Sequence, residues 1–496
     1  MTTSRVPWAP VLLLLSVLPA GIGRAAPPAD APEPPTILSI PVEAEPVVDG
    51  KAADGAWRFA PETEVSVGAP TAAGRAPRGW IRCAHDADHV WFLVSWEDGT
   101  KDVEHQPWVW DAAKGAYEQG KQREDMLALA FENTGPFSAD PFASDEASFD
   151  VWNWKAARTD PSGHAMDRFE RRTRTKPEED AHEVKASDGT PVWVVRTEDS
   201  GDSVQRKRDA PEKNEGDKVA RFLPGTPSGS AADVAAKATW SNGRWTVELS
   251  RRLVTGCPDD TSFDLGRPVL FSVAAPRGNA ENEAGSGVLR LRWARKAVTR
   301  DFDDQEPGRI ADGFRAGLTG QGKPGRWIVV DDKLLGRTLL QADNDPTDYR
   351  FPLCVMEGFT AKDVDLSVRF RTASGEVDQA GGLIWRHKDD DNYYLVRANA
   401  LEGNVVLFRV KSGRREDLPL RGLGQTYGIQ APVPPKAWNT LRVVCVGRTF
   451  EIYLNGVKLF DGDDDTFTEA GHVGLWTKAD SVTHFDDLVA ASLDAP

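Results

Sequence analysis

The sequence predicts an all-β protein that consists of two consecutive antiparallel β-sandwiches with little helix. Short apolar runs recur between turn residues through residues 37–303. Polar and apolar residues alternate in several segments of residues 324–496. Asn455-Gly456 stands between two of these segments and is the strongest short signal of a β-hairpin. Segments with helical periodicity are scarce, and residues 231–238 are the main candidate.

The first 36 residues are expected to lie outside the folded domains. Arg5 precedes an apolar run at residues 11–18, and small residues follow it, which is the order of a cleaved secretory signal peptide. The run is too short to span a bilayer, and no later run is long enough. We therefore expect a signal peptide at residues 1–26, a disordered proline-rich tether at 27–36, and a soluble periplasmic or extracellular protein without a membrane span.

Size and charge limit the classes of partner. The chain has 496 residues, of which 40% are hydrophobic, and this is enough for two cores. Its formal net charge is −16. Nucleic acid and anionic membranes both require a basic face that neutralises phosphates, so the acidic balance argues against either partner.

The chain has four cysteines, two in each expected domain: Cys83, Cys257, Cys354 and Cys445. None lies in a Cys-x-x-Cys-His motif, which excludes covalent c-type haem. Export would permit a disulfide in each domain. A buried thiol fits the strand pattern around Cys445 equally well, so the pairing stays open.

The first expected sandwich covers residues 37–303. Within it, residues 168–220 are rich in both charges and poor in apolar residues, which predicts a long surface insertion, or alternatively a docking arm for an acidic partner. Gly, Asp and Gln dominate residues 304–323, which are expected to form the linker between the domains. The strands expected before that linker are 90–96, 126–131, 192–195, 245–249 and 269–273.

Two tryptophans one residue apart mark the first sandwich. In an extended strand alternate side chains share a face, so Trp152 and Trp154 point the same way. Aromatic residues at this spacing usually pack against one another, which favours a core position. A slot for a planar ligand is the alternative.

Four segments occur in the order seen in one family: residues 91–98, 123–129, 152–158 and 243–249. With them, residues of about 35 to 300 resemble the haem-binding domain of the ethylbenzene dehydrogenase γ subunit and its dimethylsulfoxide-reductase-like relatives. The resemblance implies an immunoglobulin-like or carbohydrate-module-like β-sandwich. It also implies a b-type haem held between a methionine and a lysine, and electron transfer with an exported redox partner.

The family's axial ligands have no match at their usual places. The loop before the double-Trp strand, residues 136–145, contains no methionine, and residues 283–290 near the last strand contain no lysine. Haem would need substitute ligands, with the two indoles lining its slot and a cation facing its propionates. The residues expected at such a haem site are Met126, Trp152, Trp154, Lys155, Arg158, His164 and Met166.

The second expected sandwich covers residues 324–496. Residues 381–386, 392–398, 471–477 and 485–488 together resemble the concanavalin A-like jelly rolls of the laminin G and 3-keto-disaccharide hydrolase type. This resemblance implies a fold, but that architecture hosts lectins, hydrolases and adhesive modules alike.

Catalytic motifs are absent from the sequence. A retaining glycosidase needs two close carboxylates, and the Glu-x-Asp-x-x-Glu run that supplies them in one jelly-roll family does not occur in the second domain. We therefore expect a binding protein rather than an enzyme, with a lectin-like second domain that holds a polysaccharide or cell-surface glycan. A hydrolase of glycans or 3-keto sugars is the alternative. The expected sugar-binding residues, whose aromatic members core packing would explain equally well, are Trp385, Tyr393, Trp476 and Asp486.

Acidic runs suggest one metal hypothesis for the second domain. Residues 389–391 and 461–465 are rich in aspartate, which is common in turns between strands. Calcium binding by one of these runs, together with Asp486 or Asp487, is the alternative, because hard cations take several carboxylate oxygens.

Overall fold

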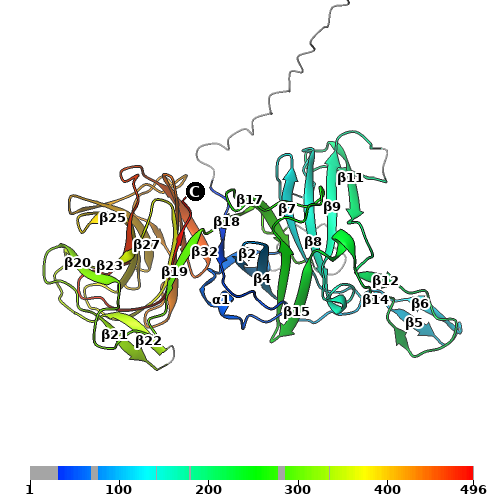
Figure 1. Cartoon of the computed structure of the whole chain (residues 1–496), viewed down its shortest axis with the longest axis horizontal. Coiled ribbons are helices and arrows are strands. Elements are labelled where there is room, and N and C mark those ends of the chain that lie inside the picture. Colours follow the sequence, from blue (N-terminus) through cyan, green and yellow to red (C-terminus); the bar gives the residue numbers. More distant parts are fainter. Residues whose placement is uncertain are drawn as a thin grey trace, which may run out of the picture.

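The computed structural model describes residues 32–68, 76–140, 142–177, 180–276, 285–333 and 336–494. It confirms the all-β class: two β-sandwiches lie side by side, the first on the right and the second on the left of Figure 1. Helical structure in the described ranges is limited to α1 (Gly55–Phe59) and two short 3-10 turns, and none of it is long and apolar enough to cross a membrane. The predicted signal peptide, residues 1–26, lies outside the described residues.

One large sheet forms the first sandwich and folds so that its two halves face each other across a core. The order across the sheet is β10-β11-β9-β8-β7-β17-β18-β1-β3-β4-β16-β15, with β2 paired to β3. Neighbours are antiparallel except β1, which runs parallel to both β18 and β3. The strands are β1 (Thr36–Pro41), β2 (Thr63–Ser66), β3 (Arg78–His85), β4 (His89–Glu97), β7 (Met126–Thr134), β8 (Ala147–Lys155), β9 (Met166–Thr173), β10 (His182–Lys185), β11 (Pro191–Glu198), β15 (Ala235–Ser241), β16 (Arg244–Arg252), β17 (Val269–Ala274) and β18 (Leu289–Trp293).

The double tryptophan of β8 faces the core of the first sandwich. Trp152 and Trp154 are both 0% exposed. The ring of Trp154 lies 5.1 Å from that of Trp245 and 6.2 Å from that of Trp96, which come from the opposite half of the sheet. The structure therefore supports the core position that the sequence favoured for the two indoles, and not the slot for a planar ligand.

Two predictions for the first domain need correction. Residues 168–220 are not one surface insertion, because β9 and β11 extend the main sheet through them. Residues 231–238 do not form an α-helix, since a 3-10 turn ends at Ala232 and strand β15 begins at Ala235. The remaining strands of this domain form small sheets that project at the lower right of Figure 1: β5 (Trp108–Asp111), β6 (Ala116–Gln119), β12 (Gln205–Lys207), β13 (Lys218–Val219) and β14 (Phe222–Pro224).

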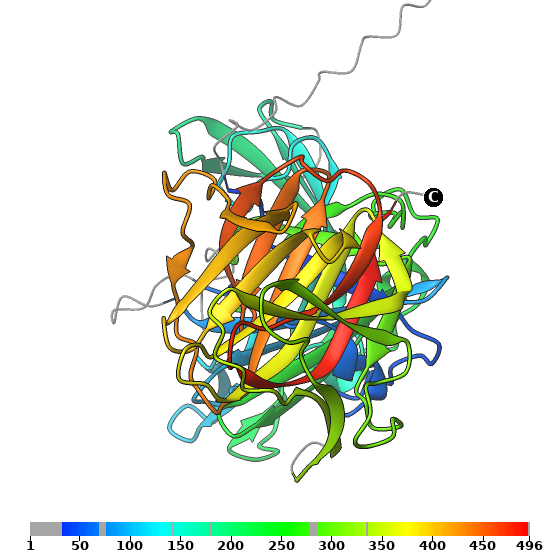
Figure 2. The same cartoon turned by 90° about the vertical axis from the view of Figure 1, so that its left-hand side faces the viewer.

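The second sandwich packs an inner sheet, which faces the first sandwich, against an outer sheet. Figure 2 looks onto the outer sheet with the first sandwich behind it. The inner sheet contains β19 (Lys296–Arg300), β21 (Trp327–Asp332), β22 (Gly336–Gln341), β24 (Val364–Ser374), β30 (Asn439–Val446), β31 (Thr449–Leu454), β32 (Val457–Asp463) and β34 (Val482–Ser492). The outer sheet contains β20 (Phe314–Gly320), β23 (Arg350–Ala361), β25 (Ala380–Asp389), β26 (Asn392–Asn399), β27 (Asn404–Lys411), β28 (Arg414–Asp417), β29 (Ile429–Gln430) and β33 (Gly471–Trp476).

The Asn-Gly hairpin forms where the sequence places it. Asn455 and Gly456 have φ values of 52° and 81° and join β31 to β32. Both positive values are those of the tight turn whose twist matches that of the flanking strands.

The domain boundary lies earlier than predicted. Strand β19, expected in the first domain, pairs with β34 of the second sandwich. Strand β20 lies inside the predicted linker 304–323 and pairs with β23. The end of the predicted tether is also fixed, because the Glu33 carboxylate lies 2.6 Å from Arg290 and 3.2 Å from Arg421.

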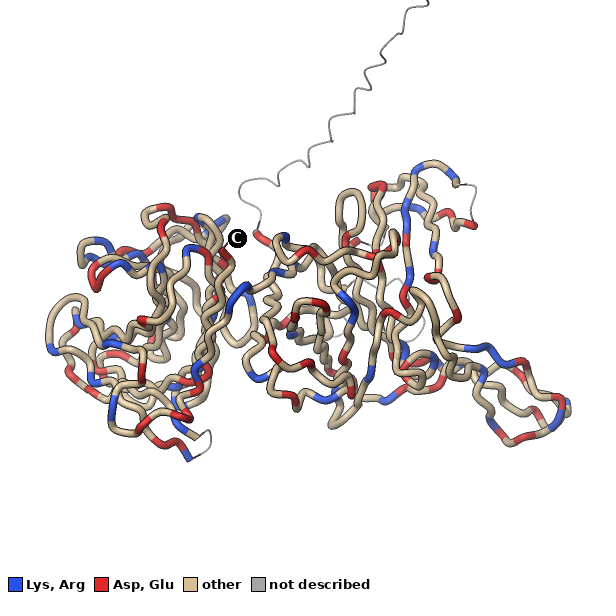
Figure 3. Tube along the Cα trace, viewed as in Figure 1, with Lys and Arg blue, Asp and Glu red and all other residues tan. Residues whose placement is uncertain are grey.

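Buried charged groups join the two sandwiches. Arg442 of β30 forms hydrogen bonds of 2.8 and 2.6 Å with the Asp365 carboxylate and also donates to Thr63 and to the Thr36 carbonyl of the first sandwich. Thr36 in turn donates its hydroxyl to Glu451, at 2.7 Å. Elsewhere acidic and basic residues are interspersed along the trace of both domains (Figure 3).

Candidate functional site

A row of soft and basic side chains crosses the outer face of the first sandwich. Because Trp152 and Trp154 face the core, their neighbour Lys155 points to the other side of β8. Met126 lies opposite Lys155 on β7, and Met166 begins β9 beside it. The Lys155 Nζ lies 3.6 Å from the Met166 Sδ, and all three side chains are at most 5% exposed. The structure thus brings three of the predicted haem-site residues together.

Arg158 and a histidine that the sequence analysis missed close this row. Arg158 forms an ion pair with Glu124, and its Nη2 lies 3.8 Å from the Met126 Sδ. The Nδ1 of His105 lies 3.1 Å from the Glu124 carboxylate. Burial, and then the positive charge of Arg158, lower the pKa of His105 to about 3, so this imidazole is neutral. No motif around His105 signals this position, because its neighbours come from distant segments.

The other predicted haem-site residues lie apart from this row. The Nδ1 of His164 donates a hydrogen bond of 2.8 Å to the carbonyl of Ser162, and His164 pairs across a β-bridge with Ala235. Trp152 and Trp154 occupy the opposite face of β8 from Lys155. A slot lined by both indoles and closed by Lys155 is therefore wrong, because alternation along the strand separates them.

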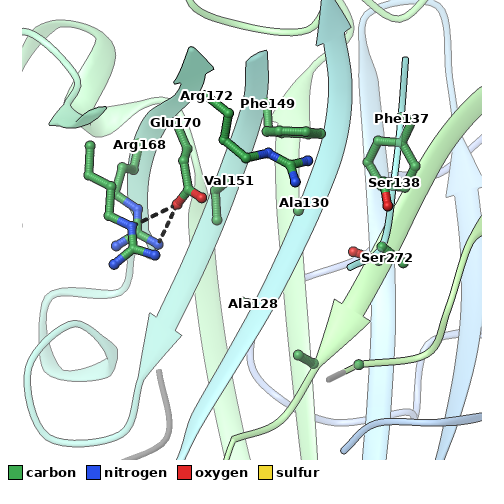
Figure 4. Close-up of a pocket in the computed structure, with 14 residues that line it drawn as sticks. Ala128, Ala130, Phe137, Ser138, Phe149, Val151, Arg168, Glu170, Arg172 and Ser272 are labelled. Carbon is green, nitrogen blue, oxygen red and sulfur yellow. Dashed lines mark hydrogen bonds and ion pairs between the residues drawn. The ribbon is translucent and has the colours of Figure 1, made fainter. Parts of the chain in front are cut away.

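A shallow hollow continues the row along the same face (Figure 4). Its floor is made of small residues of β7 and β17, among them Ala128, Ala130 and Ser272. It encloses about 120 Å³, less than the ~300 Å³ of small ligand pockets, so a ligand would lie across it. Its walls are aromatic and basic, and Glu170 lies 2.9 Å from Arg196. The wall residues are Phe137, Phe149, Arg168, Glu170, Arg172 and Arg196.

The donor types of this face fit a b-type haem, which the family resemblance implies. Lys155 and Met166 supply the amine and thioether that the resemblance calls for, although from other positions. The arginines of the hollow carry the charge that propionates would need. Iron could reach Met126 only if Arg158, which contacts its sulfur, moved aside.

The predicted sugar-binding residues of the second sandwich do not form one site. Trp385 packs in the core between the sheets, 5.3 Å from the ring of Phe450, and Asp486 lies on the inner sheet. Tyr393 and Trp476 face outward from the outer sheet but are 0% exposed. None of the three rings offers a face to a sugar, because other side chains cover them.

The side chain of Arg415 lies over the ring of Trp476 and shields it from solvent. Its guanidinium carbon lies 4.6 Å from the ring centres of Phe351 and Phe408 and 5.8 Å from that of Trp476. Burial and the nearby Arg397 lower the pKa of Arg415. Among the described residues no carboxylate forms an ion pair with it, and its Nη1 has no acceptor.

Two exposed tyrosines flank Arg415. Tyr349 is 42% exposed, packs 4.8 Å from Phe351, and accepts a hydrogen bond from the Arg415 backbone. Tyr427 is 53% exposed and lies 6.3 Å from Phe408. We call Tyr349, Arg415 and Tyr427 the outer-face site. Sequence reasoning missed it, because the three residues lie on segments without a shared motif.

A polar network borders the outer-face site. Arg397 forms two hydrogen bonds of 2.9 Å with Glu402, which also accepts one of 3.1 Å from the Tyr427 hydroxyl. Asp378 lies 2.8 Å from Lys478. Burial alone would raise the pKa of Glu402, but its bonds to Arg397 outweigh burial and lower it to about 2.

Two carboxylates of this network lie close together. The Asn399 side-chain nitrogen donates to Asp378 at 2.6 Å and to Glu402 at 2.9 Å. Burial raises the pKa of Asp378, whereas that of Glu402 is lowered. Carboxyl pairs with diverging pKa values are the arrangement that acid–base chemistry uses.

The acidic run at residues 389–391 lies at a turn, whereas residues 461–463 of the other run belong to strand β32. Asp389 pairs with Asn392 across the turn between β25 and β26, and Asp464 accepts from the Tyr394 hydroxyl. In the described ranges, groups of three or more close metal-donor side chains all lie in the first sandwich. Each of the four cysteines is a free thiol.

Comparisons with known proteins agree with this division. Residues 61–286 match the family model for ethylbenzene dehydrogenase, and residues 299–489 match that for the 3-keto-alpha-glucoside-1,2-lyase-like domain. No curated protein matched the chain.

Solved structures similar to the chain include carbohydrate binding module CBM66 from Bacillus subtilis, with 21% identity over 38% of this chain and 98% of that chain and a TM-score of 0.28. Domain 4 of AbnA, a GH43 extracellular arabinanase from Geobacillus stearothermophilus, has 16% identity over 39% of this chain and 90% of that chain and a TM-score of 0.27. The family matches confirm both resemblances seen in the sequence: the first sandwich resembles the ethylbenzene dehydrogenase family, and the second resembles the 3-keto-alpha-glucoside-1,2-lyase-like domain.

Proposed function

We propose that this protein is an exported glycan-binding protein whose second sandwich holds the sugar at the outer-face site. One observation carries the proposal: a guanidinium without a carboxylate partner in the described residues, Arg415, lies between two exposed tyrosines. Exposed apolar side chains that lie together, rather than singly, often mark a ligand site.

The chemistry of the site suits a sugar. A phenol ring offers a flat apolar face to sugar C–H groups, as Tyr349 and Tyr427 do on either side of the cation. A guanidinium donates charge-assisted hydrogen bonds to hydroxyl or carboxylate oxygens. The match of residues 299–489 to a family model named for a glucoside-cleaving activity supports a carbohydrate as the ligand. The signal-peptide pattern of residues 1–26 supports a place outside the cytoplasm, where polysaccharides occur.

The test is a screen of the full-length protein against neutral and uronic-acid polysaccharides by affinity electrophoresis. We expect at least one polysaccharide to retard the wild type, and Tyr427→Ala and Arg415→Ala to abolish the retardation. Arg414 is the matched control, because it is the exposed neighbour on β28 whose side chain points to the other side of the strand. Arg414→Ala should be retarded like the wild type, and equal retardation of all variants would contradict the proposal.

A second candidate function is cleavage of the bound sugar, and the Asp378–Glu402 pair favours it. Asp378, whose pKa burial raises, and Glu402, whose pKa the bonds to Arg397 lower, would be the two carboxyl groups that such a reaction requires. Incubation with 3-keto-glucosides and with glycans from the screen tests this. Product formation that Asp378→Asn abolishes without loss of binding would establish the activity, and binding without any turnover would refute it.

We further propose that the first sandwich binds haem through Lys155 and Met166, whose donor atoms are buried together on one face of the sheet and would have to separate from 3.6 Å to admit the iron. A bound haem would supply one-electron transfer. Purified protein is mixed with hemin and its visible spectrum recorded, with His164→Ala as the control because His164 lies outside the row. A Soret band that shifts in Met166→Ala but not in His164→Ala supports the assignment, and a spectrum of free hemin contradicts it.

A further inference from the structure

One end of the first core contains an unusual concentration of buried carboxylates. Asp150 lies on β8 and Asp167 on β9, whereas Asp199 follows β11 and Asp260 lies in the loop after β16. All four are at most 6% exposed. They converge although they come from four separate segments of the chain.

Arg251 of β16 is the buried cation of this cluster. Its Nη1 lies 2.5 Å from Asp150 and 3.3 Å from Asp260, and its guanidinium carbon lies 4.9 Å from the Trp152 ring. Asp167 is 3.9 Å away. One guanidinium therefore faces several carboxylates, and removing uncompensated charges from water is costly.

In the described part of the chain, Arg251 forms ion pairs with the other three carboxylates but not with Asp199. One of its oxygens accepts a hydrogen bond of 3.1 Å from the Ser230 hydroxyl. The other, Oδ1, has no hydrogen-bond partner among the described residues, and the residue is only 6% exposed, so water does not freely solvate this oxygen. Carboxylate oxygens of Asp199, Asp259 and Asp260 all lie within 4.8 Å of one another, so the unpartnered side chain belongs to a preformed group of three oxygen donors.

We propose that Asp199, Asp259 and Asp260 bind a divalent cation and that the cation is Ca²⁺. Carboxylate oxygens are hard ligands, and Ca²⁺ accepts irregular sets of six to eight oxygens, including water. Asp259 is half-buried, so its side of the site is open to water molecules that complete the shell.

A bound ion would connect two parts of the domain. Asp199 directly follows β11, near the sheet edge, while Asp259 and Asp260 lie in the loop between β16 and β17. Binding to the folded state alone stabilises that state by mass action. Ca²⁺ therefore acts as a structural ion that fixes this loop over the core.

A second group of possible metal ligands lies beside the proposed Ca²⁺ site and is the alternative that the experiment must distinguish. Donor atoms of Asp233, Cys257 and Asp260 also lie within 4.8 Å of one another. A thiolate ligand favours Zn²⁺ over Ca²⁺. The two groups share Asp260 but differ in the other residues, so single variants distinguish them.

The experiment uses the full-length protein freed of metal with EDTA. Calorimetric titration and thermal unfolding are followed with Ca²⁺, Mg²⁺ and Zn²⁺ at about 5 mM, above the ~0.1–1 mM dissociation constants of weak extracellular calcium sites. We expect one Ca²⁺ per chain and a higher unfolding temperature with Ca²⁺ than with Mg²⁺.

Variants then locate the ion. Asp199→Asn and Asp259→Asn should each weaken Ca²⁺ binding by about tenfold or more, since each removes one carboxylate charge from the site. Asp259 is partly exposed, so its variant tests the site even if Asp199→Asn does not fold. The control Asp209→Asn removes an exposed carboxylate elsewhere in the domain and should bind like the wild type. Absence of binding, unchanged binding in Asp259→Asn, or a preference for Zn²⁺ that Cys257→Ala removes would each overturn the proposal.

Discussion

At the residue scale, the alternation of side chains along a strand explains which features of the site the sequence predicted and which it did not. It correctly indicated that Trp152 and Trp154 share a face and favoured the core. It could not reveal that Lys155 would meet Met166, because that contact depends on which strand pairs with β8. Arg415 was hidden for the same reason, since its aromatic partners come from three other strands.

Trp154 gives a direct test of the first core. Its ring is fully buried against Trp96 and Trp245, so Trp154→Ala should lower the free energy of unfolding by about 3–5 kcal/mol. Urea unfolding measures the change. Trp110→Ala, in the projecting β5–β6 hairpin outside this core, should cost clearly less, and equal losses would contradict the described packing.

Asp486 makes stability depend on pH. Burial, and then the charge of Asp487, raise its pKa to about 7, so the folded state keeps a proton that the unfolded state has already lost. Stability from this group is therefore present at low pH and is lost as pH rises from about 4 to about 7. Asp486→Asn should remove this part of the decline in urea unfolding at pH 5 and pH 8. A variant with the same pH dependence as the wild type would show that Asp486 is ionised normally.

At the element scale, a turn that joins two strands also contacts the neighbouring domain. The β31–β32 hairpin contacts the first sandwich, because the Glu64 backbone N–H donates to the Gly456 carbonyl at 2.9 Å. The Asn-Gly pair predicted the hairpin from sequence, but nothing local could predict its second role in the interface. Likewise the sequence places β19 in the first domain and β20 in the linker, because each is short and its place in a sheet depends on a distant partner strand.

A comparison of two glycine positions distinguishes the cost of backbone strain in a turn from the cost of disturbing the domain interface. Gly456 and Gly447 both have positive φ, but a Cβ on Gly456 would lie 3.2 Å from the Glu62 carbonyl, whereas one on Gly447 would meet nothing within 4 Å. Each alanine variant should lose about 1–2 kcal/mol through backbone strain. Gly456→Ala should lose more than Gly447→Ala in thermal or urea unfolding. Equal losses of stability in the two variants would indicate that the hairpin does not pack closely against the first sandwich.

At the scale of the whole molecule, a buried arginine of the second sandwich, paired there with Asp365, donates hydrogen bonds to the first sandwich. Arg442 is 2% exposed and binds both Asp365 and groups of the first sandwich. Removing one partner of such a pair leaves an uncompensated charge, at a cost of about 3–5 kcal/mol. The two resemblances identified both folds from sequence, yet this contact joins residues from separate domains and needed the structure.

Arg442→Met should therefore weaken the coupling between the domains. We expect differential scanning calorimetry to resolve two unfolding transitions in this variant, where the wild type unfolds in one. Arg414→Met, which changes an exposed arginine on the outer sheet, should keep the wild-type profile. Wild-type behaviour of Arg442→Met would mean that the interface contributes little to stability.

The most direct test of the account is a calorimetric titration of the glycan from the screen into wild type, Arg415→Ala and Arg414→Ala. Hydrogen bonds to a charged group contribute about 1.5–3 kcal/mol, so Arg415→Ala should bind about tenfold or more weakly. Arg414→Ala should match the wild type. Equal affinity of all three proteins would place any sugar elsewhere and contradict the outer-face site.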